Sequence, residues 1–423
     1  MQGKSSHLLA YVTRLAPLLL MPVLSASAAD GITGDWNGRR DAWMKQGVDL
    51  DFGYTVEAAR NLSGGTRRAT AHAGQLAAAG RFDLERLWGW SGMRAEASLS
   101  LRDGDSVDAR AGLGTLMQTQ EIYGRGHILR LGRAWLARSS ADGRYTVKAG
   151  RVQVGDDFNT LDCIAMNLAL CGSQPGAFAG DYWHNWPLSQ WGGVFEYRPA
   201  TDRYLRAGVY QVNPRYADTA GGGLRIAPAG TQGTLTPVEL GWTPTVRGLA
   251  AHYAVGGWYS SAPRADAVQP LGAGTITAAP VMRNGAHGGW ASAQQQLTRG
   301  NGSSERSGLR GQLAFAQGDQ RSGHINQMLG LQLIHTGTFD SRAEDRIGFG
   351  LASTRLNPRA ARAMRDRDGG ERAHREYVAE VFYGWRAVRG VDLQPGVQYI
   401  RHPGGLGTGR DAFVVGLKAD LRF

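Results

Sequence analysis

The stretch DAFVVGLKADLRF (Asp411–Phe423) ends the chain, and its apolar residues fall at every second position. From Val415 onward the residues between them, Gly416, Lys418, Asp420 and Arg422, are polar or small, so one face of the segment is apolar and the other is not. A period of two predicts a β-strand whose two faces meet different environments. The strand runs to a terminal phenylalanine, although a soluble protein has no reason to avoid a polar tail. The alternating apolar residues are Phe413, Val415, Leu417, Ala419, Leu421 and Phe423.

The same alternation recurs along the chain, with turn-forming residues between the segments, as at Ala141–Arg144 and Pro199–Arg203. About sixteen segments of this kind can be counted from their period-two pattern. One of them loses phase near Gly132, which predicts a β-bulge. The clearest segments are Gly47–Ala59, Gly92–Gly104, Thr236–Trp242, Ala250–Tyr259 and Arg375–Ala387.

Two architectures give this pattern, a soluble β-sandwich and a transmembrane β-barrel. The polar faces carry both acids and arginines, and the apolar faces often end in Tyr or Trp, which is typical of a barrel with a solvated lumen and aromatic girdles. We therefore predict an all-β fold, a transmembrane antiparallel β-barrel of about sixteen strands, an even number that closes without free edges. The last strand would then pair with the first. The aromatic residues at the ends of the apolar faces are Tyr54, Trp242, Tyr259, Tyr383 and Tyr399.

The N-terminus has the features of a cleaved export signal. Lys4 and Arg14 precede an apolar run, Leu15–Leu24, and Ala26–Ala28 gives a small-x-small cleavage pattern. The run is too short to span a bilayer, and no apolar run long enough for a transmembrane helix follows it. The prediction is a signal peptide over 1–28, with cleavage near 28/29, and an exported mature chain.

A short amphipathic helix is expected in the segment 29–47, before a barrel domain over 48–423. Trp36, Arg40 and Trp43 have helical spacing; Asp35 or Asn37 could cap the helix start, and Gly47 could end it. Two placements are open: the helix covers the periplasmic rim or packs on the wall, or it reaches into the lumen.

The chain resembles the carbohydrate-selective porin family, the glucose porins of Gram-negative outer membranes, over almost its full mature length. The resemblance begins at GITGDWNGRRDAWMKQGVDLDFGYTVEAARNLSGG (Gly31–Gly65) and continues through blocks in the family's order and spacing. It implies a monomeric sixteen-stranded barrel through which monosaccharides such as glucose diffuse, with no cofactor or metal. The terminal Phe423 then looks like the tag read by the barrel assembly machinery. The later blocks are Tyr145–Phe158, Met166–Gly172, Trp186–Pro214, Thr236–Pro244, Tyr253–Tyr259 and Val391–Gly405.

Cys163 and Cys171 are the only cysteines. Their spacing fits neither a CxxC redox motif nor a zinc site, and export favours a disulfide over two free thiols. Such a small loop would gain only roughly 2–3 kcal/mol from the bond, so its role would be to shape one long loop. The family resemblance also places paired cysteines in this loop.

Strand phase places eight candidate pore-lining residues on the lumen face. Charged groups and aromatic rings suit sugars, whose hydroxyls take charge-assisted hydrogen bonds and whose ring faces are apolar. Most lumen charges in a barrel are only solvated wall; Glu57, Arg94 and Glu96 rank highest because they share adjacent early strands and have opposite signs. Long loops over 156–191 and 213–236 are candidates to fold inward and form the constriction. The eight candidates are Glu57, Arg81, Arg94, Glu96, Glu196, Arg206, Glu239 and Trp258.

The net charge of +11 keeps a second channel function open, because an arginine-rich lumen favours anions such as sugar acids. A general diffusion porin with only a mild preference is also open. The basic residues form no stripe with interleaved aromatics, which argues against nucleic-acid binding. No nucleophile elbow or HExxH pattern is present, so no enzyme is predicted. The charged segment Arg359–Glu376 is expected to be an extracellular loop that is either simply solvated or bound to lipopolysaccharide phosphates. Membrane lipid is the other partner expected from the fold.

Overall fold

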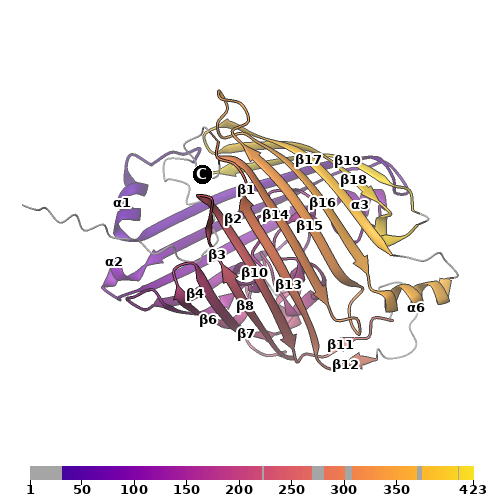
Figure 1. Ribbon diagram of the computed structural model, residues 1–423, viewed down its shortest axis with the longest axis horizontal. Helices are drawn as coiled ribbons and strands as arrows, with labels where there is room; N and C mark the ends of the chain where they lie inside the picture. Colours follow the sequence, from indigo (N-terminus) through magenta and orange to yellow (C-terminus); the bar gives the residue numbers. More distant parts are fainter. Residues whose placement is uncertain (1–30, 222, 269–280, 301–306, 369–373, 408) are drawn as a thin grey trace, which may run out of the picture.

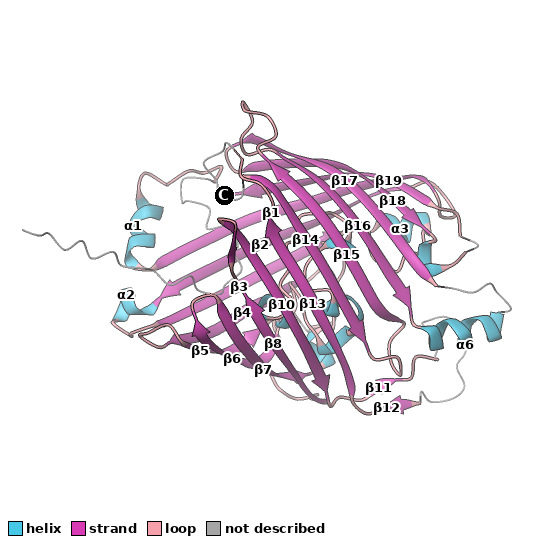
Figure 2. Cartoon of the chain, viewed as in Figure 1, coloured by secondary structure: helices cyan, strands magenta, loops and turns pink. Residues whose placement is uncertain are grey.

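The computed structural model describes residues 31–423 except 222, 269–280, 301–306, 369–373 and 408. The described chain forms a closed antiparallel β-barrel of sixteen strands, as predicted (Figures 1 and 2). The expected signal peptide, 1–28, lies outside the described residues. The barrel strands are β1 (Val48–Ser63), β2 (Thr70–Asp83), β3 (Met93–Gly104), β4 (Leu129–Ser139), β5 (Tyr145–Val152), β6 (Gln190–Ala200), β7 (Arg203–Val212), β8 (Gly233–Trp242), β10 (Leu249–Ser260), β13 (Ala286–Gln296), β14 (Gly308–Gly318), β15 (Ile325–Thr336), β16 (Arg346–Leu356), β17 (Arg375–Val388), β18 (Val391–Arg401) and β19 (Ala412–Arg422).

The last strand closes the barrel on the first. β19 pairs antiparallel with β1, for example Val56 opposite Ala419. The terminal residue itself is held, because the Phe423 N–H donates to the Phe52 carbonyl at 2.9 Å and the Phe423 carbonyl accepts from Arg40 Nη1 at 2.9 Å. The strand pairing predicted from the alternation is thus confirmed, while the role of Phe423 in assembly stays a prediction.

The two ends of the barrel differ in their connections. At one end the strands are joined by tight turns, as between β17 and β18, and by the short pieces α2 (Leu84–Trp88) and β9 (Thr245–Val246). At the other end the connections are long and carry α3 (Val107–Ala111), α6 (Pro358–Asp368) and the hairpin of β11 (Arg264–Ala265) and β12 (Met282–Arg283). Short turns face the periplasm and long loops face the outside in barrels of this kind.

The strands follow the predicted alternation. Outward residues of the wall are large, apolar and exposed, and three of the predicted girdle residues, Trp242, Tyr259 and Tyr399, are 44%, 55% and 44% exposed. The β-bulge is also confirmed: Ser98 pairs with Arg133 and Leu99 with Leu131, so Gly132 has no partner. A Cβ atom at Gly132 would lie 2.5 Å from the ring of Trp186, so the bulge carries a glycine where a ring approaches.

The helix α1 (Arg39–Gln46) lies at the short-turn end, beside the start of β1 (Figure 1). Gly47 ends it in a left-handed conformation, as expected. The expected cap is wrong, because Gly38 occupies the N-cap position; the Asp35 carboxylate instead accepts the Asp41 N–H at 3.0 Å. The helices among the described residues include none long and apolar enough to cross a membrane.

Inside the barrel, large aromatic rings lie on glycines of the neighbouring strand. Phe382 faces Gly348 directly across β17 and β16, and a Cβ atom at Gly348 would lie 2.0 Å from the Phe382 ring. The side chain of Phe382 is buried, so the ring has little room to move away. The same cross-strand pairing joins Tyr204 to Gly241, Tyr210 to Gly192 and Trp290 to Gly256.

We expect Gly348→Ala to destabilise the barrel by about 1–3 kcal/mol, because the added methyl group overpacks a buried ring. The measurement is the urea midpoint of unfolding of the purified, refolded protein. Gly193→Ala is the matched control, because its Cβ would make only an ordinary contact of 3.6 Å with the Lys148 carbonyl. Equal midpoints for the two variants would contradict the packing argument.

Candidate permeation site

The loop between β5 and β6, residues 153–189, crosses the lumen. One part is fixed to the wall that includes β5, β7 and β8: Lys148 Nζ is 2.5 Å from the Asp157 carboxylate, and the Asn159 N–H donates to Glu239 at 2.8 Å. The disulfide-containing part reaches β17 and β18, where the Asn167 side chain donates to Gln398 at 2.9 Å. The elements of this loop are α4 (Val154–Asp157), η2 (Leu168–Leu170), α5 (Pro175–Phe178) and η3 (Gly180–Tyr182).

Cys163 and Cys171 form a disulfide within this loop, as predicted. The bond encloses the segment that meets the far wall, where Gln394 donates to the Ile164 carbonyl at 2.9 Å and Gln332 donates to the Leu170 carbonyl at 2.7 Å. The prediction that the loop over 156–191 folds inward therefore agrees with the structure.

A second loop, residues 105–128 between β3 and β4, also folds inward, and the sequence analysis missed it. It touches the crossing loop, since the Glu121 N–H donates to the Met166 carbonyl at 2.9 Å. Its Leu113, Met117 and Ile122 side chains are 5%, 1% and 2% exposed. Those large apolar residues could have indicated that the loop is buried, because a solvated extracellular loop is mostly polar.

The other predicted loop, residues 213–236, lies at the rim of the barrel, next to the ends of β4 to β6. Arg130 Nη1 donates to the Tyr216 carbonyl at 3.0 Å, and the Trp191 ring N–H donates to the Ile226 carbonyl at 2.7 Å. Trp191 is outward and exposed, so this loop folds over the edge of the wall as well as toward its inner side. It is held at the rim, while the loops over 153–189 and 105–128 fill the interior.

Four buried carboxylates of the wall hold the two inner loops by their backbone. Glu380 accepts the N–H groups of Met166 and Asn167 at 2.7 and 2.9 Å, and Glu376 accepts those of Leu116 and Met117 at 2.7 and 3.0 Å. The other two carboxylates belong to predicted site residues. Glu57 accepts the Ile122 N–H at 3.3 Å, and Glu239 accepts the Asn159 N–H.

Glu57 is fully buried and lies 3.3 Å from Lys418 Nζ, which also reaches Glu121 at 2.9 Å. A carboxylate in this setting anchors a loop and pairs with a cation. Glu57 and Glu96, both ranked highest from the sequence, lie far apart along the strands. Glu57 lies opposite Ala73 while Glu96 lies opposite Arg81, eight positions along β2. At a rise of about 3.3 Å per residue they are roughly 26 Å apart.

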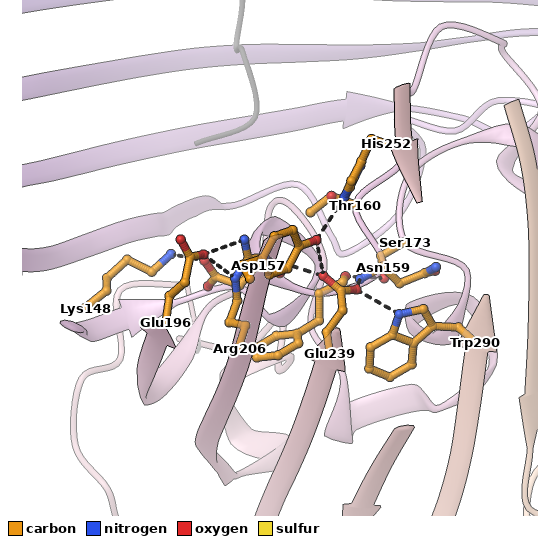
Figure 3. A network of polar contacts seen from close by, with 12 residues as sticks. Lys148, Asp157, Asn159, Thr160, Ser173, Glu196, Arg206, Glu239, His252 and Trp290 are labelled. Atoms are coloured by element: carbon orange, nitrogen blue, oxygen red, sulfur yellow. Dashed lines mark hydrogen bonds and ion pairs between the residues drawn. The ribbon is translucent and has the colours of Figure 1, made fainter. Parts of the chain in front are cut away.

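Glu196, Arg206 and Glu239 are brought together in one network (Figure 3). They face each other on three adjacent strands, and Arg206 lies 2.8 Å from Glu196 and 3.7 Å from Glu239. Glu239 also accepts the Tyr204 hydroxyl at 2.9 Å and the Trp290 ring N–H at 2.8 Å. All three predicted residues are at most 7% exposed, because the crossing loop covers them. They support this loop from the wall.

Trp258 is similarly covered, 5% exposed with its ring edge against Tyr182 of the crossing loop. Glu96 is 5% exposed and binds Arg133 at 3.0 Å. The remaining two candidates, Arg81 and Arg94, border a hollow that Glu96 also borders. Arg81 binds Asp49 at 2.9 Å and borders two hollows, one of which it shares with Arg94 at the short-turn end.

The open part of the lumen beside the crossing loop is a cavity of about 450 Å³. Its wall comes from β1, β2, β4, β16, β18 and β19, and its other side comes from Cys163, Ile164 and Trp186. Arg133 lies over the Trp186 ring at 5.1 Å, and the ring N–H donates to Gln75 at 2.8 Å. The charged residues that border the cavity are Asp51, Arg81, Arg133, Arg346, Asp392, Lys418, Asp420 and Arg422.

Most cations of this cavity are paired with carboxylates. Arg422 lies 2.5 Å from Asp392, and Arg133 is 2.6 Å from Asp156. Arg346 differs: it donates to Gln394 at 3.2 Å, and within the described residues it forms no ion pair. The sequence analysis named neither Arg346 nor Trp186. Strand phase gave no reason to single out Arg346 among the many arginines. Trp186 reaches the cavity because of the path of its loop, which strand phase does not predict.

A closed sixteen-stranded barrel, with a polar lumen narrowed by inner loops, defines the class of outer-membrane porins. Comparison with known proteins gives the family: the profile of the carbohydrate-selective porins, OprB family, matches residues 67–423. The chain belongs to this family, which places it in the bacterial outer membrane.

Its relatives agree with that assignment. The chain is 35% identical to Porin B of Pseudomonas aeruginosa over 419 residues, covering 92% of this chain and 90% of that protein. It is also 35% identical to a putative porin, QuiX, of Acinetobacter baylyi, with 93% of each chain covered. Among solved structures, the high-pH form of Pseudomonas putida OprB superposes with a TM-score of 0.87 at 31% identity, covering 93% of this chain and 99% of that one.

We expect Glu380→Ala to loosen the crossing loop, because it leaves two buried N–H groups without an acceptor at a cost of about 1–3 kcal/mol each. The expected result is faster amide hydrogen exchange in residues 159–175 and a higher, noisier single-channel conductance. Glu380→Gln keeps one acceptor oxygen, so its exchange rate and conductance should lie between those of the wild type and the Ala variant. Unchanged exchange in the Ala variant would show that the other contacts suffice to hold the loop.

Proposed function

We propose that this porin is a passive diffusion channel for monosaccharides such as glucose, with the cavity beside Trp186 as its weak sugar site. The observation that carries the proposal is the pairing of one aromatic ring with hydrogen-bonding groups in the open part of the lumen. Trp186 offers an apolar face to sugar C–H groups, the neighbouring Thr55 and Asp420 offer acceptors for hydroxyls, and the Gln75 amide group offers N–H donors.

The paired charges support a channel rather than a tight binding site. An arginine already held by a carboxylate has fewer donors left, and its field is partly cancelled, so each contact to a neutral sugar is weak. Conduction requires binding that is weak and spread over several sites. The barrel fold and the family point to a channel rather than an enzyme.

The second candidate is a channel that prefers anions such as sugar acids, and Arg346 favours it. Its guanidinium borders the cavity without an ion pair within the described residues, so a carboxylate passing there would find an available cation. Five cations and three carboxylates border the cavity, which gives it a modest positive excess.

We expect glucose at millimolar levels to reduce or interrupt the single-channel current of the purified protein in a planar bilayer, while sucrose does not. This result follows if a ring-sized sugar fits beside Trp186. If sugars leave the current unchanged and the reversal potential shows strong anion selectivity that Arg346→Gln abolishes, the anion channel is the better description.

Trp186→Ala should raise the glucose concentration needed for half-maximal block about two- to tenfold, the range expected for one lost aromatic contact. Trp186→Phe keeps a ring but loses the donor to Gln75, so it separates stacking from loop positioning. Trp242→Ala, which removes a ring from the outer surface, is the control and should leave block unchanged. Block unaffected by Trp186→Ala would place the sugar site elsewhere.

A further inference from the structure

We propose that the outer surface of the barrel beside α6 is a binding site for the phosphate groups of the outer-leaflet glycolipid. The site is a hollow of about 570 Å³ that is lined by residues of α6 and of the adjoining ends of β16 and β17. These elements lie at the long-loop end of the barrel (Figure 1). No carboxylate borders it among the described residues. Its polar lining is Arg355, Arg362, Arg365, His374 and Arg375.

Strand phase places the two strand arginines of the hollow on the outer face of the wall. On β16, Arg355 has the same parity as Leu351, which is 42% exposed, and on β17 Arg375 has the same parity as Tyr377, which is 43% exposed. Leu351 and Tyr377 belong to the surface that meets lipid. The two arginines therefore follow the apolar band and its aromatic edge, at the height where lipid headgroups lie.

Arg355 and Arg375 lie directly opposite each other on adjacent strands. Like charges in this position destabilise a sheet unless something neutralises them. Within the described residues neither forms an ion pair; Arg375 donates to the Ser353 hydroxyl at 3.0 Å and to the Gln327 side chain, both neutral. A bound anion would supply the missing charge.

The helix adds two further arginines and is held in place; one of them, Arg365, lies 3.3 Å from the carboxylate of Asp366, so its charge is partly compensated. Arg362 and Arg365 are three residues apart in α6, so both can face the same hollow. Arg359 binds Asp266 at 3.1 Å, and the buried Asn357 accepts the Arg359 N–H at 3.0 Å and donates to the Gln320 and Gly323 carbonyls. The hollow thus has a fixed wall.

These features fit a phosphorylated sugar headgroup better than a passing solute. Guanidinium groups bind phosphate through paired hydrogen bonds, and several around one hollow match a ligand with more than one phosphate. The glycolipid of the outer leaflet carries such phosphates on its sugar anchor and has acyl chains that would lie along Leu351 and Tyr377. A solute on its way to the lumen would not pass this outward surface.

The test compares the wild-type protein with a triple variant, Arg355→Gln, Arg362→Gln and Arg365→Gln, in detergent. Binding of bisphosphorylated and of dephosphorylated lipid A is measured by native mass spectrometry. We expect the wild type to prefer the phosphorylated lipid and the variant to lose at least about tenfold in affinity for it. The control variant removes three charges at the other end of the barrel: Arg203→Gln at the start of β7, and Arg247→Gln and Arg389→Gln in turns.

Several results would overturn the proposal: equal lipid binding by wild type and triple variant, equal binding of the two lipids, or a loss as large in the control variant. Inorganic phosphate bound as tightly as the lipid would indicate a site for soluble anions instead. Conductance and ion selectivity should be unchanged in the triple variant, since its residues lie outside the lumen; a changed selectivity would place them on the permeation path. Heat-modifiable gel mobility confirms that each variant forms a barrel.

Discussion

The interior of this porin depends on the hydrogen bonds between buried carboxylates of the wall and backbone N–H groups of the inner loops. A β-barrel this wide would enclose an open aqueous channel if its loops stayed outside. Glu380 and Glu376 fix one side of the interior and Glu239 fixes the other, each through N–H groups that the loops cannot satisfy internally. A carboxylate accepts several such bonds strongly, so a few residues position two long irregular segments.

Most of the wall could be predicted from the sequence, because period-two alternation fixes which residues face the lumen. It placed Glu196, Arg206 and Glu239 inward, and the strand register brings them together. The alternation could not show which inward charges remain open to a solute. That depends on where a loop crosses the lumen, and the crossing is set by contacts between segments far apart in the chain, such as Asn167 with Gln398.

The bulge at Gly132 links the wall to the candidate sugar site. An extra residue in β4 leaves Gly132 without a partner, and the absent side chain lets the Trp186 ring come close. Arg133, the next residue, then lies over that ring and also binds Glu96 and Asp156. The loss of phase visible in the sequence therefore marks the place where the strand and the crossing loop are fitted to each other, although the sequence alone gave it no function.

The net charge of +11 overstates the field that a solute meets in the cavity. Lys418, Arg133, Arg81 and Arg422 each lie within 3.3 Å of a carboxylate oxygen, so their charges are largely compensated at short range. Other arginines, such as Arg355 and Arg375 beside α6, lie on the outer surface. A neutral sugar needs no net field, only oriented donors and acceptors beside an apolar face. The preference of the channel for sugars or anions thus depends on how strongly the charge of Arg346 acts on a solute in the cavity, and not on the composition of the chain.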